Sequence, residues 1–428
     1  MKFSDHKLLK SSVISALIRG VGALTSLLMS WVIARYYGAE QAGLFFLALA
    51  IITFLGTATR AGVDISIVRF IGAAEGKNQG VRIQSVTTRA LTLTIPLTLL
   101  ASLVLFFAGD NIAAHVFKKV ALGPVLVMMG LALPGITLLT VYGMGLQGLH
   151  RTVTSVLTLK IAGPVLFIAI VFQVSFAEAN DLAALYAGSM LLAGLVGGAL
   201  FRYLRPINAI GHKISWPEFK DSSRPLWLGQ IAQQIMLLSS QIVCGIWLSS
   251  QDVALLTTAQ RTAMLTPFIL LAVNMVVTPK FSALYEQKKF SELENLAIDA
   301  TKLMLIVGMP VALFMLVFSS QIMSSFGPDF APAAVLLQII TLGQVVNIAT
   351  GSANMLLVST GNEDALKFTY YTGAAIAVIV CACLIPVYGV LGGAIATALA
   401  IAIQNIATVT MVRKRLGMTV LPPILRAN

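Results

Sequence analysis

Residues 69–77 read RFIGAAEGK, and residues 280–288 read KFSALYEQK. Both stretches begin with a basic residue and phenylalanine, and both place a glutamate and then a lysine at the same later positions, 211 residues apart. Each follows a long apolar run. The match indicates that the chain is a duplication of two similar halves, although two short loops can also resemble each other by chance.

Long apolar runs surround both stretches and decide the fold class. Of the 428 residues, 57% are hydrophobic and 11% are charged, whereas about a quarter of the residues in a soluble domain are charged. A helix needs about 20 apolar residues to cross a bilayer core, and continuous rather than alternating runs favour helices over a β-barrel. The sequence therefore predicts an all-α, polytopic membrane protein with about 12 transmembrane helices. The expected spans are residues 11–35, 41–63, 86–108, 121–146, 153–176, 182–203, 225–249, 253–278, 301–321, 332–358, 367–387 and 389–412.

The basic residues are distributed on one side of these spans. The net charge is +12, and placing the first residues in the cytoplasm puts 22 lysine and arginine residues on the cytoplasmic side. Only Arg35, Lys118 and Lys119 then fall outside. Because cytoplasmic loops of membrane proteins are enriched in basic residues, we expect both termini in the cytoplasm and attribute the positive charge to topology, not to nucleic-acid binding.

The longest polar connection divides the chain. We expect an N-terminal lobe of six helices at residues 1–206, a cytoplasmic linker at residues 207–224, and a C-terminal lobe of six helices with a short basic tail at residues 225–428. An even number of helices gives both lobes the same orientation, so the repeat is parallel. This arrangement is typical of a transporter with two lobes around a central path. The basic stretch from Arg202 to Arg224 could serve as a partner site or a lipid-headgroup contact.

Five ionisable residues remain within the predicted spans or at their ends: Arg19, Arg60, Asp64, Lys160 and Arg261. Lys160 can extend to the cytoplasmic surface, Arg60 and Asp64 are near the cytoplasmic end of the second span, and Arg19 and Arg261 sit deeper. An arginine or aspartate at a helix centre costs about 2.5–3.5 kcal/mol on insertion scales, so each should face a partner or a water-filled cavity. Arg60 and Asp64 are one helical turn apart, which predicts an ion pair.

Polar stripes accompany these charges. Arg19 shares its face with serines and a glycine, and Gln230, Gln234 and Gln241 lie on the seventh span. Since spans one and two correspond to seven and eight in the duplication, these helices are expected to line a shared cleft. Helix packing is the alternative for each small or amide residue. The polar face of residues 338–354 on the tenth span fits either a cavity wall or a packing seam.

The residue types favour transport over catalysis. The sequence has no paired carboxylates, no nucleophile with a base and no phosphate-binding loop, so we expect no catalytic residues and no enzyme activity. Cys244, Cys381, Cys383 and four scattered histidines predict neither a disulfide framework nor a metal site. No cofactor is expected, and a coupling ion, H⁺ or Na⁺, stays open. Three arginines against one carboxylate favour an anion, and guanidinium groups suit phosphate.

Several short stretches resemble a known family. They are residues 37–45 (YGAEQAGLF), 61–71 (AGVDISIVRFI), 146–151 (LQGLHR) and 279–285 (PKFSALY). In these motifs, in length and in duplication, nearly the whole chain resembles the bacterial polysaccharide flippases, the Wzx-type O-antigen translocases of the multidrug/oligosaccharidyl-lipid/polysaccharide (MOP) exporter superfamily.

The resemblance implies a MATE-like fold and a role in lipopolysaccharide or other surface-polysaccharide biosynthesis. Such a protein would flip an undecaprenyl-diphosphate-linked oligosaccharide from the cytoplasmic to the periplasmic leaflet of the bacterial inner membrane by alternating access. The central-cavity residues that would bind the diphosphate are Arg19, Arg261 and Arg60, with Asp64 as a gating or ion-coupling residue and Gln230, Gln234 and Gln241 as sugar contacts. The implied partners are the lipid-linked glycan, the phospholipid bilayer, a glycan polymerase and glycosyltransferases.

Three alternatives stay open. A cation-coupled multidrug exporter of the same superfamily would need carboxylates in the N-terminal lobe, where Asp64 is the only candidate within a span. A glycan polymerase or ligase would need a large outer loop, and the outer loops here are short. A scaffold for glycosyltransferases, without transport, is the third.

Overall fold

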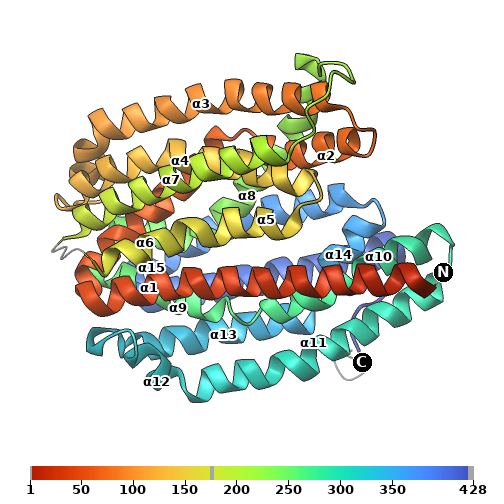
Figure 1. Cartoon of the computed structure of the whole chain (residues 1–428). Helices are drawn as coiled ribbons and strands as arrows, with labels where there is room; N and C mark the ends of the chain where they lie inside the picture. The colour runs from red at the N-terminus through yellow and green to blue at the C-terminus, as the bar shows by residue number, and fades with distance from the viewer. Residues whose placement is uncertain (1, 174–177, 423–428) are drawn as a thin grey trace. The chain divides into compact units, whose positions relative to one another are not determined.

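The computed structural model describes residues 2–173 and 178–422, and every regular element in these ranges is a helix (Figure 1). The predicted all-α class is therefore confirmed. The first elements are α1 (Lys2–Thr59), α2 (Val63–Glu75), α3 (Gly80–Asn111), the π-helix η1 (Ile112–Val116), α4 (Leu122–Gly148), α5 (Thr152–Val156), the π-helix η2 (Leu157–Ala162), α6 (Gly163–Val171) and α7 (Ala179–Leu204). The later elements are α8 (Trp216–Trp247), α9 (Ser250–Ala263), α10 (Phe268–Glu286), α11 (Phe290–Val317), α12 (Ser319–Ser324), the 3₁₀-helix η3 (Pro328–Phe330), α13 (Ala333–Ala349), α14 (Ala353–Ser359) and α15 (Glu363–Leu416).

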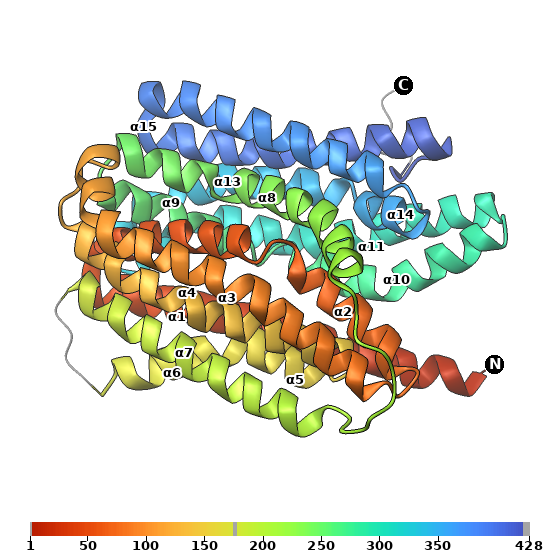
Figure 2. The same ribbon diagram turned by 90° about the horizontal axis from the view of Figure 1, so that it is seen from above.

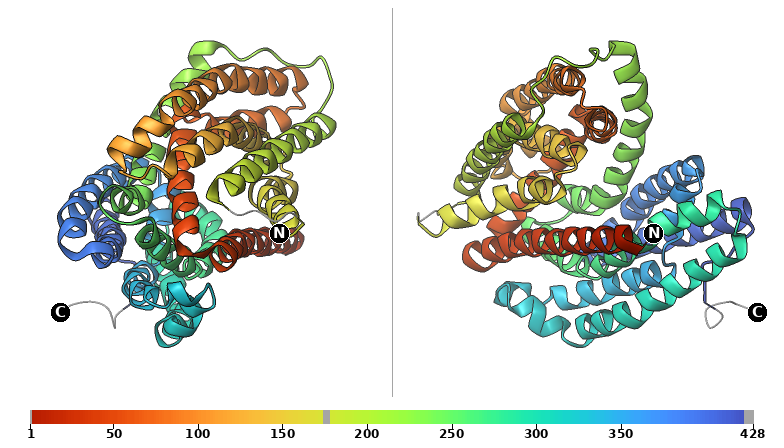
Figure 3. Two further views of the ribbon diagram at one scale, coloured as in Figure 1. Left: turned by 90° about the vertical axis from the view of Figure 1, so that its left-hand side faces the viewer. Right: turned by 45° about the vertical axis from the view of Figure 1, so that its right-hand side comes forward.

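Seven helices among the described residues are long and apolar enough to cross a membrane, or eight if the pair α13 and α14, bent by 42°, forms one span. Two of the seven contain a glycine with non-helical dihedral angles, Gly38 in α1 and Gly389 in α15. Figure 3 shows the sharp turn of the α1 ribbon, and Figure 2 shows α15 as two adjacent ribbons. Helix α8 lies at the seventh expected span, and the interrupted pair α9 and α10 lies at the eighth. When these are added and α1 and α15 are each divided at their glycine, the helices agree with about 12 predicted spans.

The chain forms two compact units. One comprises Met1–Gly20, Ile235–Cys244 and Leu255–Asn428, and the other comprises Val21–Gln234 and Gly245–Ala254. We refer to them as unit 1 and unit 2. The division into lobes at residues 207–224 stays a prediction.

Four helix-ending turns share one backbone pattern, in which an N–H donates to the carbonyl five residues earlier. The donor and acceptor pairs are Gln79 and Ala74, Arg151 and Leu146, Lys289 and Leu284, and Asn362 and Leu357. The residue before each donor has a positive φ, at Asn78, His150, Lys288 and Gly361. This is the geometry of a helix that stops in the left-handed conformation. Because the turns recur after 210 and 211 residues, the backbone supports the predicted duplication.

The structure also corrects the predicted alignment of the two repeated stretches. Superposing the turns at Asn78 and Lys288 makes Ile71 the counterpart of Phe281, and both side chains are fully buried. Phe70, which the sequence aligned with Phe281, is only partly buried. The sequence match is thus shifted by one residue from the structural one, because core position rather than residue type is preserved.

Unit 2 is built around α4, which packs against α2, α3 and α7. One core cluster joins α2, α3, α4 and α7 with residues that precede or begin α8: Val63, Ile67, Ile71, Ala74, Ile83, Val86, Ala90, Val141, Leu146, Leu149, Phe201, Ile214 and Phe219. In unit 1 the corresponding cluster joins α10, α11, α14 and α15, with Val277, Phe281, Leu293, Leu356 and Leu357 among its members.

Close helix packing in unit 2 depends on glycine. A Cβ atom at Gly135 of α4 would lie 2.5 Å from the backbone nitrogen of Leu191 in α7, and one at Gly194 would lie 2.7 Å from the carbonyl oxygen of Gly135. Small residues allow such backbone approach, which is a main source of helix association in a membrane.

Residues 205–215, which we call the strap, connect α7 to α8 and overlap the predicted linker at residues 207–224. Asn208 Oδ1 accepts a hydrogen bond from the Gly80 N–H (2.8 Å), and the Ile210 carbonyl accepts one from the Val81 N–H (3.1 Å). These donors are the first N–H groups of α3, which have no partner within their own helix, and Gln79 provides no side-chain cap. The strap is therefore an ordered segment that caps α3.

We predict that Gly135→Ala destabilises the protein by about 1–3 kcal/mol, because the added methyl group forces α4 and α7 apart. Gly188→Ala is the matched control, since a Cβ at this helical glycine of α7 meets no atom within 4 Å, and alanine favours a helix by roughly 1 kcal/mol over glycine. Thermal unfolding of both variants is followed in detergent with a thiol-reactive dye. The Tm of Gly135→Ala should fall below that of the wild type, and the Tm of Gly188→Ala should not. An unchanged Tm for Gly135→Ala would contradict the packing argument.

Candidate functional site at the break between α1 and α2

The second apolar span ends at a helix break, at residues 60–62. Helix α1 ends at Thr59, and α2 begins at Val63. Between them Ala61 and Gly62 have φ angles of 50° and 74°, in the left-handed region that glycine tolerates and alanine rarely adopts. The last carbonyl groups of α1 and the first N–H groups of α2 therefore meet at the end of an apolar span.

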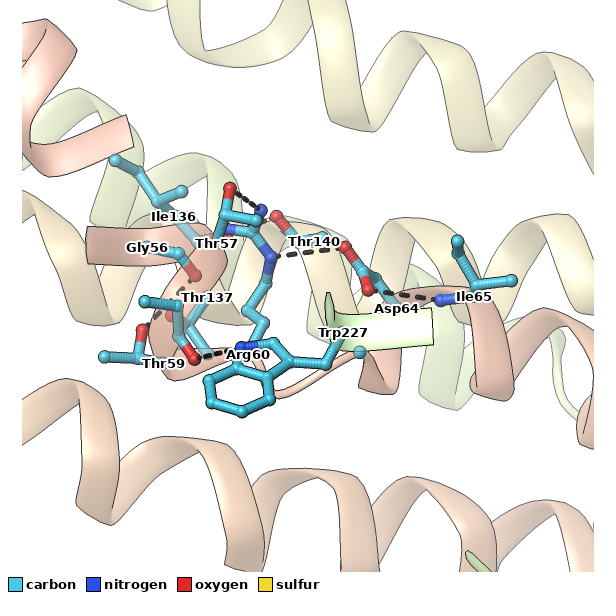
Figure 4. A network of polar contacts seen from close by, with 12 residues as sticks. Gly56, Thr57, Thr59, Arg60, Asp64, Ile65, Ile136, Thr137, Thr140 and Trp227 are labelled. Carbon is cyan, nitrogen blue, oxygen red and sulfur yellow. Dashed lines mark hydrogen bonds and ion pairs between the residues drawn. The ribbon is translucent and has the colours of Figure 1, made fainter. Parts of the chain in front are cut away.

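Arg60 lies at this break, immediately after the carboxyl end of α1. Its Nη2 donates a hydrogen bond to Thr57 Oγ1 (3.0 Å), and its Nε lies 3.4 Å from Asp64 Oδ2 (Figure 4). These contacts use two of the five N–H donors of a guanidinium. The carboxyl end of a helix carries a partial negative charge that also favours a cation there.

Asp64 is in the first turn of α2 and balances the charge of Arg60. Its side chain is 6% exposed and that of Arg60 is 13% exposed, and Asp64 Oδ1 also accepts a hydrogen bond from the Ile65 N–H (3.2 Å). A carboxylate at a helix N-terminus is favoured by the helix dipole. The predicted ion pair between Arg60 and Asp64 is confirmed, and it bridges the helix break rather than one turn of a continuous helix.

Helix α8 packs closely against the break. A Cβ at Gly62 would lie 2.2 Å from the Ser223 carbonyl oxygen and 2.7 Å from the Trp227 nitrogen, so no side chain fits at this position. Trp227 Nε1 donates a hydrogen bond to the Ala58 carbonyl (2.9 Å), and Ser223 Oγ donates one to Ser66 Oγ (2.9 Å). Hydrogen-bond partners on α8 thus stabilise the break.

A buried hydroxyl seam continues from the break into unit 2. Thr98 of α3 contacts Thr137 of α4 (Oγ1 to Oγ1, 3.0 Å) and donates to Thr59 of α1 (3.4 Å). Ser102 donates to the Gly130 carbonyl (2.8 Å). These hydroxyl groups join three helices and act as packing contacts between the break and the lipid-facing part of α3.

The other two predicted arginines are placed differently. Arg261 is half-buried in the last turn of α9 and belongs to unit 1, whereas Arg60 belongs to unit 2. Arg261 also stands near an interruption, because α9 ends at Ala263 and α10 begins only at Phe268. Arg19 is in α1, and its side chain lies outside the described residues.

The predicted glutamines fall into two groups. Gln230 and Gln234 are half-buried on α8 within unit 2, and Gln230 Oε1 is buried without a hydrogen-bond partner among the described residues. Gln241 is buried in unit 1, where its Nε2 donates to Gln260 Oε1 (2.7 Å). Gln260 in turn donates to Ser240 and Thr397 (2.7 and 2.8 Å). Gln241 and Gln260 together therefore join α8, α9 and α15.

The polar face of the tenth span acts partly as a packing seam. Gln338 Nε2 donates to the Leu316 carbonyl and to Ser319 Oγ (3.2 and 2.9 Å), which ties α13 to α11 and α12. Asn347 donates to Gln344 on the same helix (3.0 Å).

Sequence reasoning missed Trp227, Gln260 and Thr397. Trp227 contacts the break through 169 residues of sequence separation, and no local pattern signals such a pairing. Gln260, next to Arg261, was detectable as a polar residue within an apolar span. Thr397 lies in a continuous apolar run, where a hydroxyl group bonded to a backbone carbonyl is common.

The described residues also limit the chemistry of the site. No group of three or more His, Cys, Asp or Glu side chains in residues 2–173 and 178–422 could hold a metal ion. Asp64 is a buried carboxylate, and it is paired with Arg60. The break can therefore exchange ion-pair and hydrogen-bond partners, and Arg60 can offer its other N–H groups to an anion.

Known families match this chain over much of its length. The model of the family described as "Polysaccharide biosynthesis protein" matches residues 8–285, which is more than half of the chain. The chain belongs to this polysaccharide biosynthesis protein family. The MatE family model matches residues 225–384.

Two curated relatives are more distant. Stage V sporulation protein B of Bacillus subtilis is 23% identical over 319 residues, which cover 68% of this chain and 61% of that protein. The probable flippase AglR of Haloferax volcanii is 21% identical over 201 residues, which cover 46% of this chain and 42% of AglR. The chain thus matches about three fifths and two fifths of the length of these relatives.

Solved structures share the fold. The lipid II flippase MurJ in an inward closed conformation gives a TM-score of 0.74 with 16% identity, covering 94% of this chain and 87% of MurJ. An inward-facing multidrug resistance MATE family transporter of the MOP superfamily gives a TM-score of 0.73 with 18% identity, covering 95% and 98%. The protein is therefore a membrane protein with the fold of MOP-superfamily transporters, as the sequence predicted.

We predict that Asp64→Asn lowers stability by about 3 kcal/mol, because it leaves the buried Arg60 charge without its counter-charge. The double variant Arg60→Gln/Asp64→Asn removes both charges, and its Tm should recover toward that of the wild type. Asp329→Asn is the control, since that aspartate is exposed. Thermal unfolding of the wild type, Arg60→Gln, Asp64→Asn and the double variant forms a double-mutant cycle, and additive effects at residues 60 and 64 would show that the two side chains do not interact.

Proposed function

We propose that this protein is a flippase that moves an undecaprenyl-diphosphate-linked oligosaccharide, an O-antigen or related surface-polysaccharide repeat unit, across the bacterial inner membrane. Transport runs from the cytoplasmic to the periplasmic leaflet by alternating access, with both termini in the cytoplasm. The family match supports this proposal, as do the names of two similar proteins, a probable flippase and a lipid II flippase.

The observation that carries the proposal is the charge of the ionisable residues inside the spans. The buried carboxylate of Asp64 is neutralised by Arg60 at 3.4 Å. Arg261 is a second half-buried arginine, on α9. A transport path with more arginine than carboxylate side chains is suited to an anionic headgroup. Guanidinium groups bind diphosphate oxygens with paired, permanently charged donors.

We assign the diphosphate to Arg19 and Arg261 and gating to the break at Arg60 and Asp64. A helix break formed by left-handed residues and held by exchangeable hydrogen bonds can absorb a change of backbone direction, as hinges do. Approach of a diphosphate to Arg60 would compete with Asp64 for the guanidinium and loosen this hinge. Gln230 and Gln234, which are half-buried on α8, are the candidates for contacts with sugar hydroxyls. Gln241 could contact sugar only by exchanging its hydrogen bond with Gln260.

A cation-coupled multidrug exporter is the second candidate. The MatE match at residues 225–384 and the shared fold with a MATE transporter favour it. Such an exporter needs a carboxylate that can take up a proton or Na⁺, and Asp64 could do so only after its ion pair with Arg60 has opened. The pairing of Asp64 therefore favours the flippase. A coupling ion is compatible with both functions.

The test uses a bacterial strain whose surface glycan depends on this protein. Arg261→Ala should reduce surface glycan at least tenfold at unchanged protein abundance in the membrane, and Arg261→Lys should retain part of it, because lysine keeps the charge but loses the paired donors. Arg413→Ala is the matched control, an exposed arginine at the end of α15. Glycan is measured by immunoblotting and abundance through an epitope tag.

The same strains separate the two functions. Full glycan display with Arg261→Ala would exclude the proposed diphosphate role. Loss of dye efflux in a drug-sensitised strain with Asp64→Asn, accompanied by normal glycan display, would establish the exporter instead. The flippase requires the opposite pattern. Asp64→Asn should fail to display glycan, and the wild type should show no dye efflux.

A further inference from the structure

The strap and the helix ends beside it expose large apolar side chains. Tyr203 at the end of α7 is 84% exposed, Ile207 86% and Ile210 54%, and Trp216 at the start of α8 is 37% exposed. The strap is not loose, because it caps α3 through Asn208, and neighbouring Ile214 and Phe219 are fully buried in the core of unit 2. The apolar side chains are therefore held outward by an ordered backbone.

Basic side chains are interspersed with these apolar ones. Arg202, Lys213, Lys220 and Arg224 are exposed around the strap. Of the two acidic residues nearby, Glu218 is already paired with Arg82 of α3, which leaves Asp221. An excess of positive charge with exposed aromatic and aliphatic groups is the composition that binds anionic membrane surfaces.

Trp216 organises a more specific part of this surface. The Arg89 guanidinium lies 4.7 Å from the centre of the Trp216 ring, and the Lys220 ammonium lies 5.5 Å from it. Arg89 Nη1 is buried without a hydrogen-bond partner among the described residues. Two cations held on one aromatic ring form a site suited to a phosphate group.

Helix α3 places this site at the level of lipid headgroups. Beyond Arg89, positions at helical spacing along the same face are exposed and apolar: Leu100 is 60% exposed, Leu103 52% and Phe107 76%. These residues belong to a span that is apolar enough to cross the membrane, so this face contacts acyl chains. Arg89 lies where that face ends, and tryptophan is enriched at the same depth.

We propose that Arg89, Trp216 and Lys220, together with Tyr203, Ile207 and Ile210, form a binding surface for anionic phospholipid headgroups, the strap face. The phosphate of the headgroup contacts Arg89 and Lys220, and the apolar side chains enter the acyl boundary. The site is separate from the diphosphate residues proposed above, and its occupant is a lipid of the surrounding bilayer. Continuity with the lipid-facing side of α3 favours this occupant over a soluble protein partner.

Helix α8 links the strap face to the break between α1 and α2. The helix that begins with Trp216 also carries Ser223 and Trp227, which hold the break through Ser66 and the Ala58 carbonyl. A headgroup bound at Trp216 therefore stabilises the first turns of the helix on which the hinge depends.

Native mass spectrometry of the full chain in detergent tests the proposal. Phosphatidylglycerol, phosphatidylcholine and an undecaprenyl diphosphate are titrated separately against the wild type, Arg89→Gln/Lys220→Gln and the conservative variant Arg89→Lys/Lys220→Arg. We expect the wild type to bind phosphatidylglycerol at least fivefold more tightly than phosphatidylcholine, which corresponds to about 1 kcal/mol in total. The glutamine variant should lose this preference, and the conservative variant should keep it.

Lys302→Gln is the matched control, because Lys302 is an exposed basic residue of α11 that is paired with Asp299. Its lipid preference should equal that of the wild type. A second measurement uses vesicles of brominated phosphatidylglycerol, which should quench wild-type tryptophan fluorescence more than that of Trp216→Phe. Equal binding of the two phospholipids, or equal loss of preference in Lys302→Gln, would overturn the proposal. Preferential binding of the undecaprenyl diphosphate through Arg89 and Lys220 would also overturn it, since the strap face would then belong to the substrate path.

Discussion

The structure of unit 2 depends on one close approach, that of α8 to the break between α1 and α2. Gly62 adopts a left-handed conformation and leaves no room for a side chain against the Ser223 carbonyl. Because the backbone of α8 fills this space, Trp227 can satisfy the Ala58 carbonyl and Ser223 can bond Ser66. The exposed ends of two helices, costly in an apolar surrounding, are thereby paired with groups from a third helix. The ion pair between Arg60 and Asp64 also stabilises the break.

The strap extends the same principle to the end of the unit. Its hydrogen bonds to Gly80 and Val81 replace partners that α3 cannot provide for itself. Ile214 and Phe219 then join the core that contains Ile67 and Ile71 of α2. A segment that connects two helices thus determines how α2, α3 and the first turns of α8 fit together. This also explains why its exposed apolar side chains stay accessible.

Much of the fold followed from composition and spacing. Continuous apolar runs predicted an all-helical membrane protein, and the recurring turns at Asn78 and Lys288 agree with the duplication. The pairing of Arg60 with Asp64 was also predictable, since a separation of four residues brings side chains together. Two features were not. The repeat alignment was shifted by one residue at Phe281, because buried position is maintained while residue identity drifts, and α8 was expected to begin at residue 225 rather than at Trp216.

The sequence by itself determined the class of the protein, because hydrophobicity and charge act locally and can be counted along the chain. It also identified the ionisable residues that need a partner within the spans. Only the tertiary structure decided which partner each residue has. Gln241 of α8 is bonded to Gln260, which is bonded in turn to Thr397. Gln230 and Gln234 are also on α8 but lie in the other unit. The physical reason is that hydrogen bonds and close backbone contacts depend on distance in space, and residues such as Ala58 and Trp227 meet across 169 positions of sequence.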